Sequence, residues 1–268
     1  MRYAITLCYD GSDFYGFQRQ KEYVTVQSEV EDALRTKLQE PIVLHASGRT
    51  DAGVHALAQV AHFDCDKELD CKGFGYAVNT LLPRSIAITD CRRVPDTFHA
   101  RFDALRKTYL YRIYLSKIHS PLHRKYFHVC FYDLDLDVMD QACKYFIGEH
   151  DFRSFMLSGA KVKTTVRTVY DLHIERNEGG KQLDIFITGN GFLHNMVRAI
   201  AGTLIDVGRG RFPLESVPEI IAACDRRRAG KTLDGCGLYL CNVEYGDAMD
   251  LSDVPTPDLV RPPAPQTL

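Results

Sequence analysis

The chain has 268 residues, 45% of them hydrophobic and 25% charged, with a formal net charge of -2 at pH 7. This is the profile of an ordinary folded protein that can bury a core, and it argues against a domain that is basic overall, as many nucleic-acid binders are. Any basic surface must be local. Residues 84–125 contain ten Lys or Arg and three Asp, a run that fits either a solvated face or a local nucleic-acid surface.

Strand and helix patterns alternate in the first half of the chain. The predicted strands are residues 3–9, 42–45, 57–63 and 86–94, and the predicted helices are residues 26–38 and 73–82. The order β-α-β-β-α-β is that of a split β-α-β unit.

The pattern begins again after Asp103. The predicted strands are residues 107–115, 166–175, 182–188 and 237–245, and the predicted helices are residues 135–146, 192–207 and 214–224. We therefore expect an α+β protein of two tandem ferredoxin-like (split β-α-β) halves, residues 1–103 and 104–246, with antiparallel sheets and a central cleft. Residues 247–268 hold five of the eleven prolines and are predicted to form an extended tail.

The stretch S-G-R-T-D-A-G-V-H-A begins at Ser47. Its two glycines, Gly48 and Gly53, favour a tight, exposed turn. Arg49 and Asp51 are two residues apart, so in extended chain their side chains point the same way. The pair is either an ordinary surface salt bridge or a carboxylate held ionised as a nucleophile, and spacing alone leaves both open.

Aromatic and basic residues alternate at the start of the second half. Tyr109 and Tyr111 share one face of a predicted strand that follows Arg106 and Lys107. Such a surface can stack an unpaired base beside bound phosphates. The strand propensity of tyrosine fits a core position equally well.

Two further stretches carry charge near the C-terminal end of the second half. In the helix predicted at 192–207, His194 and Arg198 are four residues apart, and Arg198 can pair with a carboxylate or remain a solvated charge. The stretch D-R-R-R-A-G-K at residues 225–231 reads as a helix end and loop that could meet phosphates.

Several kinds of site are not signalled. The nine cysteines form no C-x-x-C pair, the histidines do not have metal-ligand spacing, and no glycine-rich nucleotide motif is present. We therefore expect no metal and no cofactor. The N-terminal apolar run is too short for a secretory signal and no stretch is long enough to span a bilayer, so we expect a cytoplasmic protein without membrane contact. A lone Asp beside an Arg fits covalent catalysis at an electrophilic carbon, as in glycosidic bond cleavage.

The motif at Ser47 resembles the active-site motif of the tRNA pseudouridine synthase A family, and other signatures follow in the family's order. They are Y-D-G-S-D-F-Y-G-F-Q-R-Q at residues 9–20, T-V-Q at 25–27, F-H-A-R-F at 98–102, K-T-Y-L-Y-R-I at 107–113, D-F-R-S-F at 151–155 and F-L-H-N-M-V-R at 192–198. One departure is Phe17, where the family often has Trp.

The resemblance implies roles for four residues. Asp51 would be the nucleophile, Arg49 would help to flip the target uridine and fix the carboxylate, and Arg198 would pair with Asp51. Tyr109 would stack on the extruded base and take part in proton transfer. The substrate would be uridine at positions 38 to 40 in the tRNA anticodon arm, bound across a homodimer.

Basic residues outside these four are predicted to contact phosphates. They are Arg92, Arg93, Arg101, Arg106, Lys107, Arg226, Arg227 and Arg228. Two alternatives remain at this point: an RNA-binding module that keeps the fold without the reaction, and an isomerase that acts on another structured RNA. The presence of Asp51, Arg49, Tyr109 and Arg198 together argues against the first.

Overall fold

The computed structural model describes residues 1–160, 162–177, 179–251 and 254, and it has a mixed α+β fold. The chain divides into two compact units. Unit 1 is Met1–Leu105 with Leu240–Leu268, and unit 2 is Arg106–Tyr239. Most of the tail predicted for residues 247–268 lies outside the described residues.

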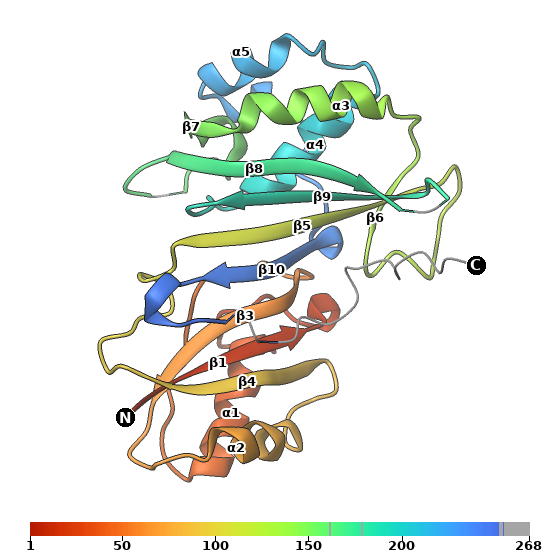
Figure 1. Ribbon diagram of the computed structural model, residues 1–268. Helices are drawn as coiled ribbons and strands as arrows, with labels where there is room; N and C mark the ends of the chain where they lie inside the picture. The colour runs from red at the N-terminus through yellow and green to blue at the C-terminus, as the bar shows by residue number, and fades with distance from the viewer. Residues whose placement is uncertain (161, 178, 252–253, 255–268) are drawn as a thin grey trace, which may run out of the picture. The chain divides into compact units, whose positions relative to one another are not determined.

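Unit 1 contains a sheet with two helices packed beside one another (Figure 1). Its strand order is β4-β1-β3-β10, with a short β2 paired to β3. The strands are β1 (Arg2–Tyr9), β2 (His45–Ala46), β3 (His55–Asp64), β4 (Ile86–Val94) and β10 (Leu238–Glu244), and the helices are α1 (Val26–Leu38) and α2 (Cys71–Asn79). The pairs of β1 with β3 and with β4 are antiparallel.

Local chemistry fixes the start of α1. Thr25 caps it: the Ser28 amide donates to the Thr25 hydroxyl at 3.2 Å, and the Thr25 amide donates to the Ser28 hydroxyl at 3.0 Å. This reciprocal arrangement satisfies two donors that a helix end otherwise leaves unpaired. Val26, Val30 and Leu34 are fully buried along one face of the helix, as its apolar spacing predicts.

Within unit 2 the strand order is β5-β9-β8-β7, with β6 paired to β5. The strands are β5 (Arg106–Leu115), β6 (His128–Cys130), β7 (Gly148–Asp151), β8 (Val166–Arg176) and β9 (Gln182–Gly189). The helices are α3 (Leu136–Cys143), α4 (Met196–Gly208) and α5 (Ser216–Ala222). Short 3-10 turns occur in both units. In unit 1 they are at Gly11–Asp13 (η1) and Gly246–Ala248, and in unit 2 at Lys144–Phe146, Phe152–Phe155, Arg226–Arg228 and Gly235–Gly237.

The prediction of purely antiparallel sheets is wrong in one place, because β6 runs parallel to β5. The short strands β6 and β7 were not predicted. In addition, β10, predicted as the last strand of the second half, contributes Leu240–Glu244 to unit 1.

The strand predicted at residues 42–45 is also wrong for most of its length, because the structure has a strand only at His45–Ala46. Side chains of α1 take the backbone groups that a strand would use. The Leu44 amide donates to the Glu31 carboxylate at 2.9 Å, and the Leu44 carbonyl accepts from the Gln27 side chain at 3.1 Å. Ile42 and Leu44 remain buried, which accounts for the strand-like sequence pattern.

Candidate active site

The turn that carries Arg49 and Asp51 lies between β2 and β3. At its start, the Ser47 amide donates to the Val60 carbonyl at 2.7 Å, and the Ser47 hydroxyl donates to Gln59. The Gln59 side chain then donates to the Gly48 carbonyl at 2.9 Å. Ser47 and Gln59 are fully buried, so neutral polar groups hold the entry to the turn.

A distant part of the chain braces the middle of the turn. The Phe17 amide donates to the Thr50 carbonyl at 3.0 Å, and the Tyr9 and Thr50 hydroxyls are 2.8 Å apart. Gly16 has a φ of +88°, and a Cβ at this position would lie 2.8 Å from the Thr50 carbonyl oxygen and 3.2 Å from the Asp51 carbonyl carbon. The backbone of residue 16 can approach Asp51 this closely only because it is glycine.

The end of the turn is held in the same way. Gly53 has a φ of +74°, and the Val54 amide donates to the Asp51 carbonyl at 3.2 Å. The Gly11 amide donates to Nδ1 of His55, which is 2% exposed. His55, the last polar residue of the motif, therefore has a structural role in joining the turn to the segment after β1.

These contacts leave Arg49 exposed and Asp51 partly buried. A carboxylate on a fixed backbone beside an exposed guanidinium is suited to act on a bound substrate, because little has to be reorganised when the substrate arrives.

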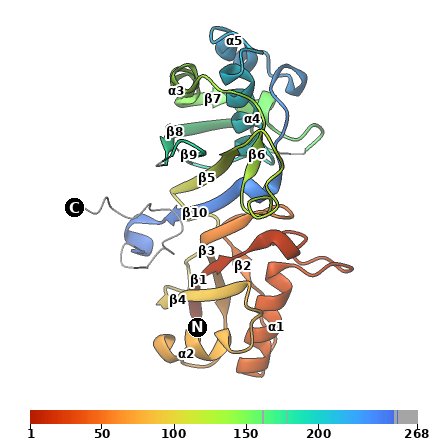
Figure 2. The same ribbon diagram turned by 90° about the vertical axis from the view of Figure 1, so that its right-hand side faces the viewer.

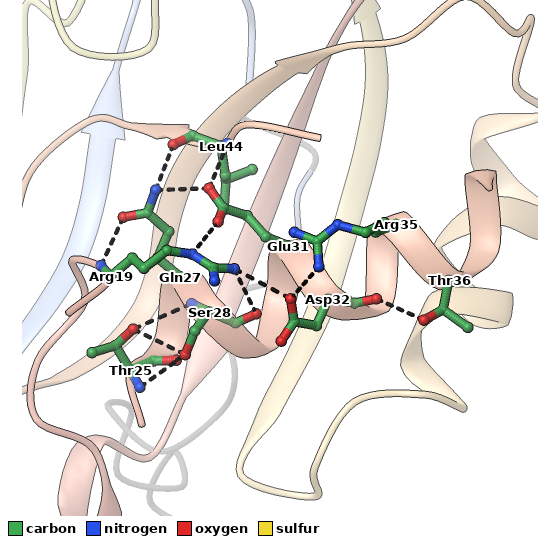
Figure 3. Close-up of polar contacts among 9 residues, drawn as sticks. All are labelled: Arg19, Thr25, Gln27, Ser28, Glu31, Asp32, Arg35, Thr36 and Leu44. Carbon is green, nitrogen blue, oxygen red and sulfur yellow. Dashed lines mark hydrogen bonds and ion pairs between the residues drawn. The ribbon is translucent and has the colours of Figure 1, made fainter. Parts of the chain in front are cut away.

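A second layer of polar contacts, drawn in Figure 3, supports the chain that enters β2 and the segment that follows Phe17. Glu31, with a side chain only 6% exposed, accepts from the Arg19 guanidinium at 2.6 Å, from the Gln27 side chain at 2.8 Å and from the Leu44 amide at 2.9 Å. The carboxylate thereby ties residue 19, the helix α1 and the chain entering β2 together. Glu31 cannot be identified from the sequence, because nothing in its spacing shows that it is buried.

In unit 2, the predicted stacking residue Tyr109 lies on β5 opposite Ile187. Tyr109 is 8% exposed, and its ring meets that of Phe192 edge to face with centroids 5.1 Å apart. Tyr111 is fully buried and its hydroxyl donates to the Asp234 carbonyl at 2.8 Å. Tyr111 is therefore a core residue, and Tyr109 lies at the edge of the core.

Arg198 lies in the first turn of α4 and is partly buried. Its Nε donates to the Leu233 carbonyl at 2.6 Å, and another guanidinium nitrogen donates to the Asn195 side-chain oxygen at 3.0 Å. Both bonds fix the plane of the guanidinium. The helix predicted from residue 192 begins only at Met196, because Asn195 has a left-handed φ of 68°, which asparagine tolerates better than most residues.

The residues predicted to contact phosphates fall into two groups. Four of them lie within 4 Å of a carboxylate of the protein: Arg92 at Asp90, Arg93 at Asp96, Arg227 at Asp225 and Arg228 at Glu219. The others have different surroundings: Arg101 lies over the Phe102 ring, Arg106 lies over the Tyr170 ring, Lys107 is partly buried on β5, and Arg226 donates to Thr232. Arg101, Arg106 and Arg226 better suit an external anion, because none of them forms an ion pair with a carboxylate in the described part of the chain.

Among the described residues, no group of three or more His, Cys, Asp or Glu side chains is arranged to hold a metal ion. No helix in the described part of the chain is both long and apolar enough to cross a membrane.

Comparison with known proteins places the chain in a family. The family model described as tRNA pseudouridine synthase matches residues 6–103 and 142–246. The tRNA pseudouridine synthase A of Caldicellulosiruptor bescii is 44% identical over 242 residues, which cover 90% of this chain and 98% of that protein. The protein of the same name from Bacillus subtilis is 44% identical over 247 residues, which cover 91% of this chain and 99% of that protein.

Among solved structures, a chain of the "Crystal Structure of a Cbf5-Nop10-Gar1 Complex" is 12% identical, with a TM-score of 0.37 over 89% of this chain and 48% of that one. A likeness at this score supports no statement about the fold or the function.

The sequence matches define an enzyme that modifies RNA. The chain belongs to the tRNA pseudouridine synthase family, and it converts uridine to pseudouridine in tRNA. The resemblance stated from the motifs is therefore confirmed, as is the prediction of an isomerase rather than a binding module.

Proposed function

We propose that Asp51 is the nucleophile of this isomerase, and that its substrates are the uridines at positions 38 to 40 of the tRNA anticodon arm. The observation that carries the proposal is the turn itself. Backbone and neutral side-chain contacts hold it from both ends, and it presents a partly buried carboxylate two residues from an exposed arginine.

The reaction suits a site built from side chains alone. The bond between C1′ of the ribose and N1 of the uracil breaks, the base turns while it stays bound, and a bond forms between C1′ and C5. C5 then loses its proton, and N1 ends with one, so no electrons are gained or lost overall. A carboxylate nucleophile can hold the separated fragment between the two bond changes.

The remaining predicted residues have supporting roles in this proposal. Arg49, exposed beside Asp51, helps to displace the target base from its stack, which every enzyme that acts on a stacked base must accomplish. Tyr109 stacks on the extruded uracil, and Arg198 pairs with Asp51 and keeps it ionised. Arg101, Arg106, Lys107 and Arg226 contact phosphates.

The larger architecture is part of the same proposal. The order of elements along the chain, β1-α1-β2-β3-α2-β4 and then β5-α3-β8-β9-α4-β10 with short elements between, supports two tandem ferredoxin-like halves, residues 1–103 and 104–246, with the predicted central cleft as the place of reaction. We further propose a homodimer that acts on tRNA in the cytoplasm.

The experiment that tests the substrate is position mapping. A tRNA transcript with a single uridine at position 38, 39 or 40 of the anticodon arm is incubated with the enzyme, and pseudouridine is located in the product. We expect product at each of these positions and none at uridines in the other arms. Product only in another arm would refute the proposed substrate positions while leaving the isomerase activity intact.

A further inference from the structure

Two tyrosines form an exposed stacked pair close to the turn that carries Asp51. The rings of Tyr15 and Tyr23 have centroids 4.2 Å apart and an interplanar angle of 29°. They are 56% and 45% exposed. Large aromatic side chains usually bury most of their surface, whereas these two stack on one another and leave about half of their surface in water.

The backbone beneath the pair is fixed. The Tyr15 amide donates to the Val24 carbonyl at 3.1 Å, and the Gln20 side chain donates to the Tyr15 carbonyl at 2.8 Å. These bonds close residues 15–24 into a loop, and the Thr25 cap of α1 anchors its end. In Figure 2 the stretch between η1 and α1 extends outward from the rest of unit 1. The two rings are thus presented on a closed loop with a defined backbone.

The loop is joined directly to the catalytic turn. Gly16 follows Tyr15, and its backbone packs against Thr50 and Asp51. The next residue, Phe17, donates its amide to Thr50. Tyr15 is therefore one residue away from a backbone contact with Asp51, which places one end of the stacked pair beside the turn.

The charge of the loop favours a base over a phosphate as the group it binds. Arg19 is bound to the carboxylates of Glu31 and Asp32 (Figure 3). Lys21 and Glu22 are exposed neighbours of opposite charge. A loop whose charges are balanced in this way offers a phosphate little net attraction, whereas any base has a π-face that can stack on an aromatic ring.

We propose that Tyr15 and Tyr23 form a stacking platform for an unpaired base of the tRNA next to the target uridine. The inference rests on the proposed role of Asp51, since that role places the target uridine at the turn. The platform would hold the neighbouring base after the target base leaves the stack, and would contribute to substrate binding rather than to bond making.

The first test compares substitutions in the full-length enzyme acting on a tRNA transcript. We expect Tyr15→Ala and Tyr23→Ala to raise KM about tenfold, as loss of one base stack would, and to leave kcat within about twofold. Tyr15→Phe and Tyr23→Phe keep the rings and are expected to match the wild type. Tyr76→Ala is the matched control, since Tyr76 is 80% exposed on α2 of the same unit.

Salt dependence separates a base contact from a phosphate contact. The logarithm of the tRNA binding constant falls linearly with the logarithm of the salt concentration. Loss of a base stack leaves the steepness of this fall unchanged, whereas loss of one phosphate contact makes it shallower by about one unit. Unchanged KM in both alanine variants, or a reduced slope, would overturn the platform. If the wild-type enzyme forms no pseudouridine with this RNA, the proposed substrate fails instead, so the two failures are distinguishable.

A second test does not depend on the folding of any variant. Transcripts with 5-iodouridine on either side of the target uridine are bound to the wild-type enzyme and irradiated, and the crosslinked peptide is sequenced by mass spectrometry. A stacked iodouracil crosslinks to the aromatic ring it touches, so we expect the adduct on Tyr15 or Tyr23. Adducts only on other residues would contradict the proposal.

Discussion

Asp51 in unit 1 and Arg198 in unit 2 are positioned in different ways. The Asp51 turn is held by carbonyls, amides and neutral side chains, and by a glycine that lets a second backbone come close. Arg198 is held through its own guanidinium, by the Leu233 carbonyl and the Asn195 side chain. Because of this difference, we expect added volume beside the turn to displace Asp51, and the loss of a single hydrogen-bond acceptor to displace Arg198.

The largest effect is expected for Gly16→Ala. The added Cβ would lie 2.8 Å from the Thr50 carbonyl oxygen, so the turn must shift, and a displacement of about 1 Å in a catalytic group can cost about 100-fold in rate. We expect kcat to fall by about that factor. Gly210→Ala is the control, because Gly210 also has a positive φ, +72°, but nothing lies within 4 Å of its added Cβ. Equal rates for the two variants would show that the close approach does not position Asp51.

Glu31→Gln tests whether the buried carboxylate that joins residue 19, α1 and the chain entering β2 stabilises the protein. A neutral amide has one acceptor oxygen and cannot serve Arg19, Gln27 and the Leu44 amide together, so we expect about 2 kcal/mol lower stability in urea unfolding. Asp32→Asn is the control, since the Asp32 side chain is 56% exposed and also contacts Arg19. We expect it to cost under about 1 kcal/mol. Equal losses would mean that the burial of Glu31 has no energetic consequence.

Asn195→Gly tests the positioning of Arg198. Glycine keeps the left-handed backbone but removes the acceptor 3.0 Å from the guanidinium. We expect kcat to fall about tenfold with little change in tRNA affinity, and Asn195→Asp, which retains an acceptor oxygen, to recover most of the loss. A fall of the same size in both variants would argue against positioning through this hydrogen bond.

The smallest effect concerns His62 of unit 1, which is 1% exposed and whose Nδ1 accepts from the Ala100 amide at 3.2 Å. Burial, together with the charge of Arg2 and the neighbouring His99 and His45, lowers the pKa of His62 from 6.5 to about 4.

The folded-state pKa is lower than the unfolded one, so below pH 6.5 the unfolded chain takes up a proton that the folded chain does not. Stability is therefore full above pH 6.5 and falls as the pH drops toward 4, by about 1 kcal/mol per pH unit. Unfolding of wild type and His62→Gln between pH 7 and 5 measures this. We expect the dependence of the unfolding free energy on pH to be weaker in His62→Gln and unchanged in the exposed control His119→Gln. An unchanged dependence in His62→Gln would show that another group causes it.

Much of the fold follows from local pattern, as α1 illustrates. Its apolar spacing predicts a helix at residues 26–38, and the structure has α1 at Val26–Leu38. The predicted element boundaries are wrong where side-chain hydrogen bonds or an unusual backbone conformation override the local sequence pattern. Residues 42–44 have a strand-like pattern, but side chains of α1 take the polar groups of Leu44. The start of α4 is delayed by the left-handed Asn195, which periodicity cannot reveal.

The candidate site also has some features that the sequence predicts and others that only the folded structure shows. The turn with Arg49 and Asp51 could be predicted, because two glycines and two charged residues in a short stretch carry their own signal. The bracing by Gly16 and the burial of Glu31 could not, because they depend on segments that meet only after folding. The stacked Tyr15 and Tyr23 are eight residues apart with no periodic relation, so only the closure of their loop shows that they are partners.

The role of Asp51 is tested by release of tritium from C5-labelled uridine in a tRNA anticodon-arm transcript, with wild type and Asp51→Asn compared at equal RNA occupancy. Formation of the new bond at C5 is followed by loss of the label, so we expect release by the wild type and none by the variant, with RNA binding retained. Release by Asp51→Asn at a rate near that of the wild type would contradict the assignment of Asp51 as the nucleophile.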